Sequence, residues 1–387
     1  MSAKTKSQNN ANQASLYIGL MSGTSADGID LALVDFAGKQ PQLVASYFAP
    51  YSLAIREEIT GLYVPGHNEI DRAGFLDKKL ALCFSDAIND FLQQQNLSSD
   101  QIQAIGNHGQ TIRHRPEGNH AFTQQIGCCQ TLACDTGIRV VGQFRQKDMA
   151  LGGQGAPLVP AYHQAIFQQA GSDVCVVNIG GISNISYLPG DLKRQPCGFD
   201  IGPGNALLDD WYRRHHKRCE IGIDMDGHWA ATGSVNQQLL TLLKSDPYFL
   251  LPYPKSTGRE YFHIDWLNAK LNAYQAGELD IAPEDIQATL VALTSQTIAD
   301  TVEILSSHSD VIICGGGAKN KTLMQSLKNN LPTHRVMLST DKGIDNDSLE
   351  AVVFAWLARQ FDLRLPSNLP CVTGASRACS LGIEYFP

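Results

Sequence analysis

The sequence predicts an α/β protein built from two related domains, and three observations lead to this prediction. The chain has 387 residues, more than a single hydrophobic core usually contains. Short apolar runs typical of strands alternate with segments of helical spacing. A strand, a glycine turn and a second strand occur near residue 16 and again near residue 174. Because the two copies lie far apart, they indicate duplicated domains rather than a solenoid.

The segment from Leu16 to Phe36 is the clearest hairpin. Two apolar runs, 16–20 and 31–36, flank a turn rich in glycine, serine and aspartate. Glycines let the backbone approach an oxyanion, and successive N–H groups form an anion-binding nest. The tip is therefore either a phosphate-binding loop or a solvated surface turn. A turn of this composition is more often a surface turn, but Asp27 and Asp30 give the two readings equal weight, because carboxylates there can face a metal ion or handle a proton.

A shorter copy of this hairpin follows the middle of the chain. An apolar strand over 174–178 leads into Gly180 and Gly181, and a second run covers 185–188. Two phosphate hairpins facing one another would hold a polyphosphate from both sides. The second hairpin therefore strengthens the phosphate reading of the first.

Composition excludes several functional classes. With 43% apolar and 18% charged residues, the chain has the composition of a soluble globular protein. A net charge of -8 argues against a nucleic-acid partner, which needs a basic face. The one basic run, 213–218, is interpreted as a solvated helix face. Ten cysteines without C-x-x-C pairs form neither a disulfide framework nor a zinc site.

The N-terminus and the hydropathy pattern predict where the protein resides. Residues 1–15 are polar and lack the apolar core of a signal peptide, so we expect a disordered leader. No run approaches the roughly 20 apolar residues that span a bilayer. We therefore expect a cytoplasmic protein with reduced thiols and no membrane partner.

After the first hairpin the pattern predicts a strand over 42–48, helices over 53–62 and 75–97, and a short strand over 102–105. The motif N-H-G-Q-T follows this strand, at the edge where open α/β sheets place ligands. His108 is thus a site candidate, although a histidine in a loop can simply be solvated. Its spacing of six residues to the next histidines is not that of metal ligands.

Residues 140–160 are dense in glycine and charge. Arg145 and Asp148 flank a predicted turn, and three glycines follow it. The segment is either an interdomain hinge or a substrate loop in which Arg145 binds an anion. The sequence does not separate these alternatives.

Asp200 is the candidate general base. It lies between a strand and a predicted helix over 206–216, where Gly202 and Gly204 leave room for a substrate beside the carboxylate. The alternative is an aspartate that only caps the helix or closes a turn.

The proline-rich segment 245–262 is predicted to be an ordered loop. Its candidate anion contacts are Lys255, Ser256, Thr257 and Arg259, although a structural loop is favoured.

The last third of the chain predicts a nucleotide platform. A helix over 283–305 and a strand over 310–313 precede three glycines, whose bare backbone suits a base and ribose. Neither a Rossmann nor a Walker spacing is present. Glu350 opens a helix over 351–359, where the helix dipole favours a carboxylate. A catalytic role for it is also open.

Together these segments resemble the sugar kinase/Hsp70/actin superfamily and, more narrowly, the anhydro-N-acetylmuramic acid kinase family. The motifs that carry the resemblance are G-L-M-S-G-T-S-A-D-G-I-D (19–30), N-H-G-Q-T (107–111), F-R-Q-K-D (144–148), G-G-Q-G-A-P-L-V-P (152–160), N-I-G-G-I-S-N (178–184), G-F-D-I-G-P-G-N (198–205), P-K-S-T-G-R-E-Y-F (254–262), C-G-G-G (314–317) and L-P-C-V-T-G-A (369–375).

The resemblance implies a two-domain, actin-like (ribonuclease H-like) ATPase fold with an interdomain cleft for nucleotide and substrate. We expect domains at 16–140, with 365–387 as a candidate completion, and at 141–364. The implied reaction converts ATP, 1,6-anhydro-N-acetylmuramic acid and water to ADP and N-acetylmuramic acid 6-phosphate, in peptidoglycan recycling. ATP, Mg²⁺ and a homodimer are the implied cofactors and assembly.

The resemblance also implies roles for individual residues. Asp200 would be the catalytic base and Glu350 a second active-site acid, while His108, Arg145 and Asp148 would line the sugar site. Asp27 is the candidate contact to Mg²⁺ through water. The residues implied to bind ATP are Gly23, Thr24, Ser25, Ala26, Asp27, Gly28, Ile29, Asp30, Gly180, Gly181, Gly202, Gly204, Gly315, Gly316, Gly317 and Asn320.

Three positions depart from the family pattern: Cys128 and Gln143 each stand where an acid is common, and Ile201 where threonine is common.

Two other functions compete with the kinase. A nucleotide-switched binding protein of the Hsp70 or actin type would need a client domain or a polymer-forming surface. A glycosidase with two carboxylates leaves the triple glycine unexplained.

Overall fold

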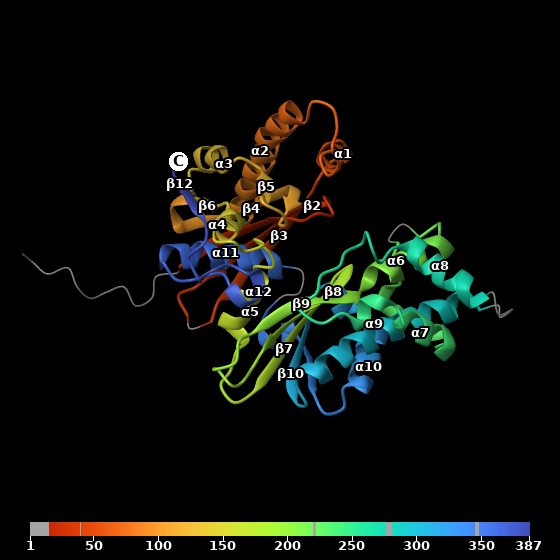
Figure 1. The fold of residues 1–387 in the computed structure, drawn as a ribbon. Helices are drawn as coiled ribbons and strands as arrows, with labels where there is room; N and C mark the ends of the chain where they lie inside the picture. The colour runs from red at the N-terminus through yellow and green to blue at the C-terminus, as the bar shows by residue number, and fades with distance from the viewer. Residues whose placement is uncertain (1–14, 39, 220–221, 276–280, 345–347) are drawn as a thin grey trace, which may run out of the picture. The chain divides into compact units, whose positions relative to one another are not determined.

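The computed structural model describes residues 15–38, 40–219, 222–275, 281–344 and 348–387, which divide into two compact units (Figure 1). The first unit comprises 1–162 and 348–387, and the second comprises 163–347. Apart from Ser15, the expected leader lies outside the described residues.

The first unit contains a seven-stranded mixed sheet in the order β12-β6-β4-β1-β2-β3, with β5 paired to β4. Its strands are β1 (Leu16–Ser22), β2 (Gly28–Asp35), β3 (Gln42–Pro50), β4 (Ile102–Arg115), β5 (Phe122–Ile126), β6 (Val140–Gly142) and β12 (Ile383–Tyr385). Its helices are α1 (Leu53–Thr60), α2 (Glu69–Gln95), α3 (Cys129–Thr136), α4 (Phe144–Ala150), α11 (Leu349–Asp362) and α12 (Pro370–Thr373), and α5 (Val159–Phe167) crosses into the second unit.

The second unit contains a five-stranded mixed sheet in the order β11-β10-β7-β8-β9. Its strands are β7 (Asp173–Ile179), β8 (Ile182–Leu188), β9 (Cys197–Pro203), β10 (Ser309–Cys314) and β11 (Arg335–Leu338). Its helices are α6 (Asn205–His215), α7 (Gln237–Lys244), α8 (Ile264–Gln275), α9 (Pro283–Leu305) and α10 (Lys321–Asn330).

The two units repeat one strand order. In the first unit β1 is antiparallel to β2 and parallel to β4, and β2 is antiparallel to β3. In the second unit β7 is antiparallel to β8 and parallel to β10, and β8 is antiparallel to β9. The orders β3-β2-β1-β4-β6 and β9-β8-β7-β10-β11 therefore match in both sequence and direction. The predicted α/β fold with two related halves is confirmed.

The first sheet is covered on both faces, as the alternation along β1 requires. Ile18 and Leu20 are buried in a core that includes Leu80 and Phe84 of α2. On the opposite face α11 packs directly on the strands. A Cβ on Gly19 would lie 1.7 Å from the Ala351 carbonyl oxygen, so a glycine is needed for this close approach.

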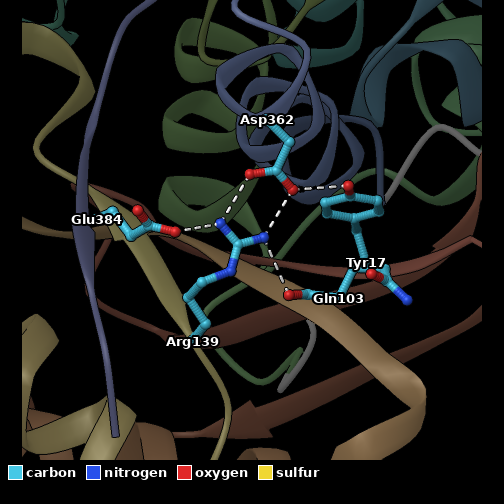
Figure 2. Close-up of polar contacts among 5 residues, drawn as sticks. All are labelled: Tyr17, Gln103, Arg139, Asp362 and Glu384. Carbon is cyan, nitrogen blue, oxygen red and sulfur yellow. Dashed lines mark hydrogen bonds and ion pairs between the residues drawn. The ribbon is translucent and has the colours of Figure 1, made fainter.

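A cluster of charged and polar groups joins the C-terminal segment to the N-terminal part of the first unit (Figure 2). Arg139 donates to both carboxylate oxygens of Asp362, at 2.7 and 2.6 Å, and to Glu384 at 2.5 Å. Tyr17 donates to Asp362 at 2.8 Å, and Arg139 also reaches the Gln103 carbonyl oxygen at 3.1 Å. These bonds link α11 and β12 to the central strands of the first sheet.

The unit boundaries lie at 162/163 and 347/348, whereas the sequence led us to expect them at 140/141 and 364/365. Residues 141–162 extend the first unit because β6 pairs with β4 and α4 follows it directly. Residues 348–364 belong there as well, because α11 packs on β1 and β4. Only long-range contacts determine these boundaries, and no local signal in the sequence indicates them.

Two expected loops are regular structure. The motif N-H-G-Q-T lies inside β4, which continues to Arg115 rather than ending at 105. Residues 144–150 form α4, so Arg145 and Asp148 lie one turn apart on a helix instead of flanking a turn. The predicted helix over 283–305 agrees with α9 at both ends.

Candidate active site

The tip of the first hairpin consists of residues 23–27 between β1 and β2. Ala26 is buried and has a φ of 51°, an unusual backbone conformation for alanine, and its N–H donates to the Gly23 carbonyl oxygen at 3.1 Å. The Ser25 hydroxyl donates to the exposed Asp27 carboxylate at 2.7 Å. Gly28, Ile29 and Asp30 lie in β2, and the Ile29 side chain is buried in the core. Of Ile29, only the backbone is therefore available to a ligand.

A polar network around the buried Ser22 and Gln110 side chains supports this tip. The Ser22 hydroxyl donates to Gln110 at 2.6 Å and lies 2.7 Å from the Tyr51 hydroxyl. Gln110 donates in turn to the Gly23 carbonyl oxygen and to the Tyr63 hydroxyl, at 3.1 and 3.2 Å. The Tyr63 hydroxyl donates to the Thr24 carbonyl oxygen at 3.0 Å. Sequence reasoning missed Tyr51 and Tyr63, which carry no local motif.

His108 and Arg145 are in direct contact in the first unit. The guanidinium donates to His108 Nε2 from Nε at 3.2 Å and from Nη2 at 3.0 Å. His108 Nδ1 lies 3.3 Å from the Ser22 carbonyl oxygen, so Nδ1 carries the proton. Burial and the Arg145 charge lower the pKa of His108 to about 3. The imidazole is therefore neutral at physiological pH.

Glu350 is a charged neighbour of Arg145, at the start of α11. The Glu350 side chain is exposed. Surrounding protein groups remove part of the hydration of its carboxyl and so raise its pKa, and the charge of Arg145 opposes that rise. Burial lowers the pKa of Arg145, and Glu350 opposes that change as well. The structure thus brings together three of the residues predicted for the active site.

Asp148 is fully buried behind them. One carboxylate oxygen accepts from the Gly155 N–H at 2.8 Å, and the other accepts from Asn368 at 2.7 Å and Thr373 at 2.8 Å. Arg145 donates to the Gly155 carbonyl oxygen at 2.8 Å. Asp148 therefore holds in place the segment that orients Arg145.

In the second unit, the β7–β8 tip consists of Gly180 and Gly181. Their carbonyl oxygens accept backbone N–H groups from residues 204–206, at 2.8 to 3.1 Å. Asn205 Nδ2 adds a bond to the Ile179 carbonyl oxygen at 3.1 Å. The tip is thus held by backbone groups that follow β9.

The glycines after β10 lie against the end of β7, directly before the β7–β8 tip. A Cβ on Gly315, which has a φ of 80°, would lie 2.2 Å from Asn178 Oδ1. A Cβ on Gly317 would lie 2.3 Å from an Ile179 methyl carbon. Gly316 is exposed between them, and Asn320 caps α10 by accepting the Leu323 N–H at 2.9 Å. The glycines predicted to bind nucleotide at 180–181, 204 and 315–317 therefore lie close together.

Asp200 lies at the centre of β9. Its Oδ2 accepts from the Ser256 hydroxyl at 2.9 Å and from the Thr257 N–H at 3.0 Å. Within the described part of the chain, Oδ1 has no hydrogen-bond donor. Burial raises the pKa of Asp200, the Thr257 and Ser256 bonds lower it, and the Glu260 charge raises it further.

A family model described as anhydro-N-acetylmuramic acid kinase matches residues 15–387. The chain belongs to the anhydro-N-acetylmuramic acid kinase family. It is 55% identical over 384 residues to the Colwellia psychrerythraea kinase of this name, covering 96% of this chain and 97% of that protein. It is 49% identical over 372 residues to the Pasteurella multocida kinase, covering 95% and 96%. The predicted family, its ATP-dependent kinase activity and its role in peptidoglycan recycling are thereby confirmed.

Solved structures outside the family are more distant. The activator of 2-hydroxyisocaproyl-CoA dehydratase from Clostridium difficile, with bound ADPNP, is 11% identical, with a TM-score of 0.40 over 88% of this chain and 92% of its own. A likeness this weak carries no weight, so the fold assignment depends on the strand order and the family. No helix in the described ranges is both long and apolar enough to cross a membrane.

Proposed function

We propose that Asp200 is the general base of a hydrolytic phosphorylation of 1,6-anhydro-N-acetylmuramic acid. The observation that carries this assignment is the state of its carboxylate. Oδ2 is fixed by two donors, while Oδ1 has none in the described ranges. A base must be oriented and must keep one oxygen for the proton it accepts.

The chemistry follows from the bond that closes the anhydro ring. O6 of the sugar is bonded to C1, so no free 6-hydroxyl exists before the ring opens. Asp200 takes a proton from a water that attacks C1, the C1–O6 bond breaks, and O6 keeps the electron pair. O6 then attacks the terminal phosphorus of ATP and ADP leaves. The proton passes from Asp200 to solvent.

The sugar is assigned to the first unit's cluster. Arg145 offers a fixed guanidinium for an anionic or carbonyl group of the sugar, because His108 and the Gly155 carbonyl orient it from two sides. Glu350 is the matching acceptor for sugar hydroxyls. Asp148 is a positioning residue rather than a contact, since it is fully buried and both of its oxygens accept bonds from protein donors.

The ATP phosphates are assigned to the backbone N–H groups of the tips, and the base and ribose to the glycines after β10. Mg²⁺ fits the first tip, because Asp27 is an exposed carboxylate with one oxygen that accepts no bond in the described ranges. Mg²⁺ usually binds through one or two carboxylates, water and phosphate. It would supply charge neutralisation at the phosphates.

The sharpest test of the reaction uses ¹⁸O-labelled water with ATP and the anhydro sugar. We expect label at the anomeric hydroxyl and none in the phosphate. Label in the phosphate would contradict ring opening by water at C1.

The test of the base is Asp200→Asn, which keeps the shape and removes the proton acceptor. We expect kcat to fall by about 10³-fold or more while nucleotide binding persists. Asp265→Asn, an exposed change in α8, is the control and should leave kcat unchanged. Near-normal turnover by a folded Asp200→Asn variant would remove Asp200 from its role.

Two further assignments come from the resemblance. We expect a homodimer, which sedimentation of the purified protein checks, and residence in the cytoplasm, which cell fractionation checks.

A further inference from the structure

The segment 255–259 connects the candidate base to the β7–β8 tip within the second unit. The Asp200 N–H donates to the Lys255 carbonyl oxygen at 3.0 Å, and Ser256 and Thr257 hold the Asp200 carboxylate. Residues 255–257 of this segment are therefore bound to β9. Arg259 follows Thr257 by only two residues.

Arg259 lies against Gly181. A Cβ at Gly181 would come 2.6 Å from Arg259 Nε and 2.8 Å from Nη2, so any side chain at Gly181 would displace the guanidinium. Within the described ranges the guanidinium has no hydrogen bond or ion pair, and its side chain is exposed. Its five N–H donors remain available to an external acceptor.

The surroundings favour an anion as that acceptor. The tip consists of two glycines, which have no side chain and therefore supply no charge. Their carbonyl oxygens already accept the backbone N–H groups of residues 204–206. The nearby Asp209 shares its charge between Arg213 and Arg259, so it does not neutralise Arg259 fully. Arginine binds phosphate through two parallel bonds, and a glycine tip beside the guanidinium has no side chain to obstruct such a ligand.

We infer that Arg259 binds the terminal phosphate of ATP at the β7–β8 tip. The inference rests on the proposed function, because it takes Asp200 to act on the sugar that receives this phosphate. Two residues span about 7 Å at most, so Arg259 lies near the contact that fixes Asp200. The phosphate within its reach is therefore the one that is transferred, rather than those retained in ADP.

The test is the affinity of the full chain for the β,γ-imido analogue of ATP and for ADP, measured by calorimetry without sugar. Arg259→Met removes the charge and keeps a flexible apolar stem. It should weaken analogue binding by about tenfold to hundredfold and change ADP binding less than about twofold. Arg259→Lys should recover part of the loss, because it restores the charge but not the planar fork.

The matched control is Arg213→Met. Arg213 also lies near Asp209, but it belongs to α6, pairs with Asp210 and donates to the Gly222 carbonyl oxygen at 3.4 Å. This change should leave both affinities unaltered. Unchanged analogue binding by Arg259→Met, or an equal loss for analogue and ADP, would overturn the inference.

Failure of the inference is distinguishable from failure of the proposed function. If the wild-type chain phosphorylates the anhydro sugar and Arg259→Met binds the analogue normally, only the role of Arg259 is lost. If a folded Asp200→Asn variant keeps near-normal turnover, the proposed role of Asp200 is wrong, whatever Arg259 binds.

Discussion

The two hairpin tips occupy equivalent places in two sheets of the same order, yet they are built differently. The first tip has five residues, 23–27, and buried side chains support it from below. The second has two glycines, held by backbone N–H groups. A tip with side chains brings its own carboxylate and hydroxyls and depends on polar partners for its shape. A glycine tip depends on the backbone and obtains charge from another segment.

The largest effect expected from this comparison is that of Gln110→Ala. Gln110 is fully buried, and its loss removes three hydrogen bonds, to the Ser22 hydroxyl, the Gly23 carbonyl oxygen and the Tyr63 hydroxyl. Each lost hydrogen bond costs about 1 kcal/mol, so we expect a loss of about 3 kcal/mol in stability. The KM for ATP should rise about tenfold, because the tip loses its support. Denaturant unfolding and steady-state kinetics measure the two effects.

The matched change at the second tip is Asn205→Ala. It removes one side-chain bond, to the Ile179 carbonyl oxygen, and leaves the backbone bonds of residues 204–206 intact. We expect a cost of about 1 kcal/mol. If Asn205→Ala destabilises the protein as much as Gln110→Ala does, the distinction between the tips fails.

A smaller effect concerns the pH at which the base works. Asp200 must be ionised to accept a proton, so activity rises with pH through its raised pKa. Ser256→Ala removes a bond to the charged form, which should raise that pKa and move the acidic limb of kcat/KM up by about one pH unit. Glu260→Gln removes a repelling charge and should move the limb down by about half a unit.

Opposite signs from these two variants would identify the acidic limb as that of Asp200. His108 supplies no competing limb near neutrality, because its pKa of about 3 leaves it neutral. Shifts of the same sign would assign the limb to another group.

Sequence patterns predicted the hairpins, α9 and the glycine-rich turn after β10. Each of these depends on short-range periodicity or on a turn that needs glycine. They missed α4, because its seven residues are too few to show a helical period and glycines flank it on both sides. They also missed Tyr51 and Tyr63, which reach the first tip from elsewhere in the chain. The unit boundaries depend on pairs such as Arg139 and Asp362, which are 223 residues apart. Contacts of this kind have no local signature.

The smallest effect concerns backbone strain, which also differs between the units. In the described ranges, five of the six non-glycine residues with positive φ lie in the first unit. They are Ala26, Asn68, Asn96, Gln143 and Arg364, whereas the second unit contributes Asp226. Two of the five, Ala26 and Gln143, adjoin the candidate active site, since Gln143 directly precedes α4. Strain thus accumulates in the unit whose tip carries side chains.

Gln143 is the position at which this strain can be relieved. It is exposed, has a φ of 56° and makes no capping bond to α4. Asparagine tolerates this backbone conformation better than glutamine does, so Gln143→Asn should stabilise the protein by about 0.5 kcal/mol. Gln143→Val, with a branched side chain, should destabilise it by about 1 kcal/mol or more. Thermal unfolding should register the first change as a rise of about 1–2 °C with kcat unchanged. If Gln143→Asn lowers kcat, the residue acts in the sugar site itself rather than through the conformation that starts α4.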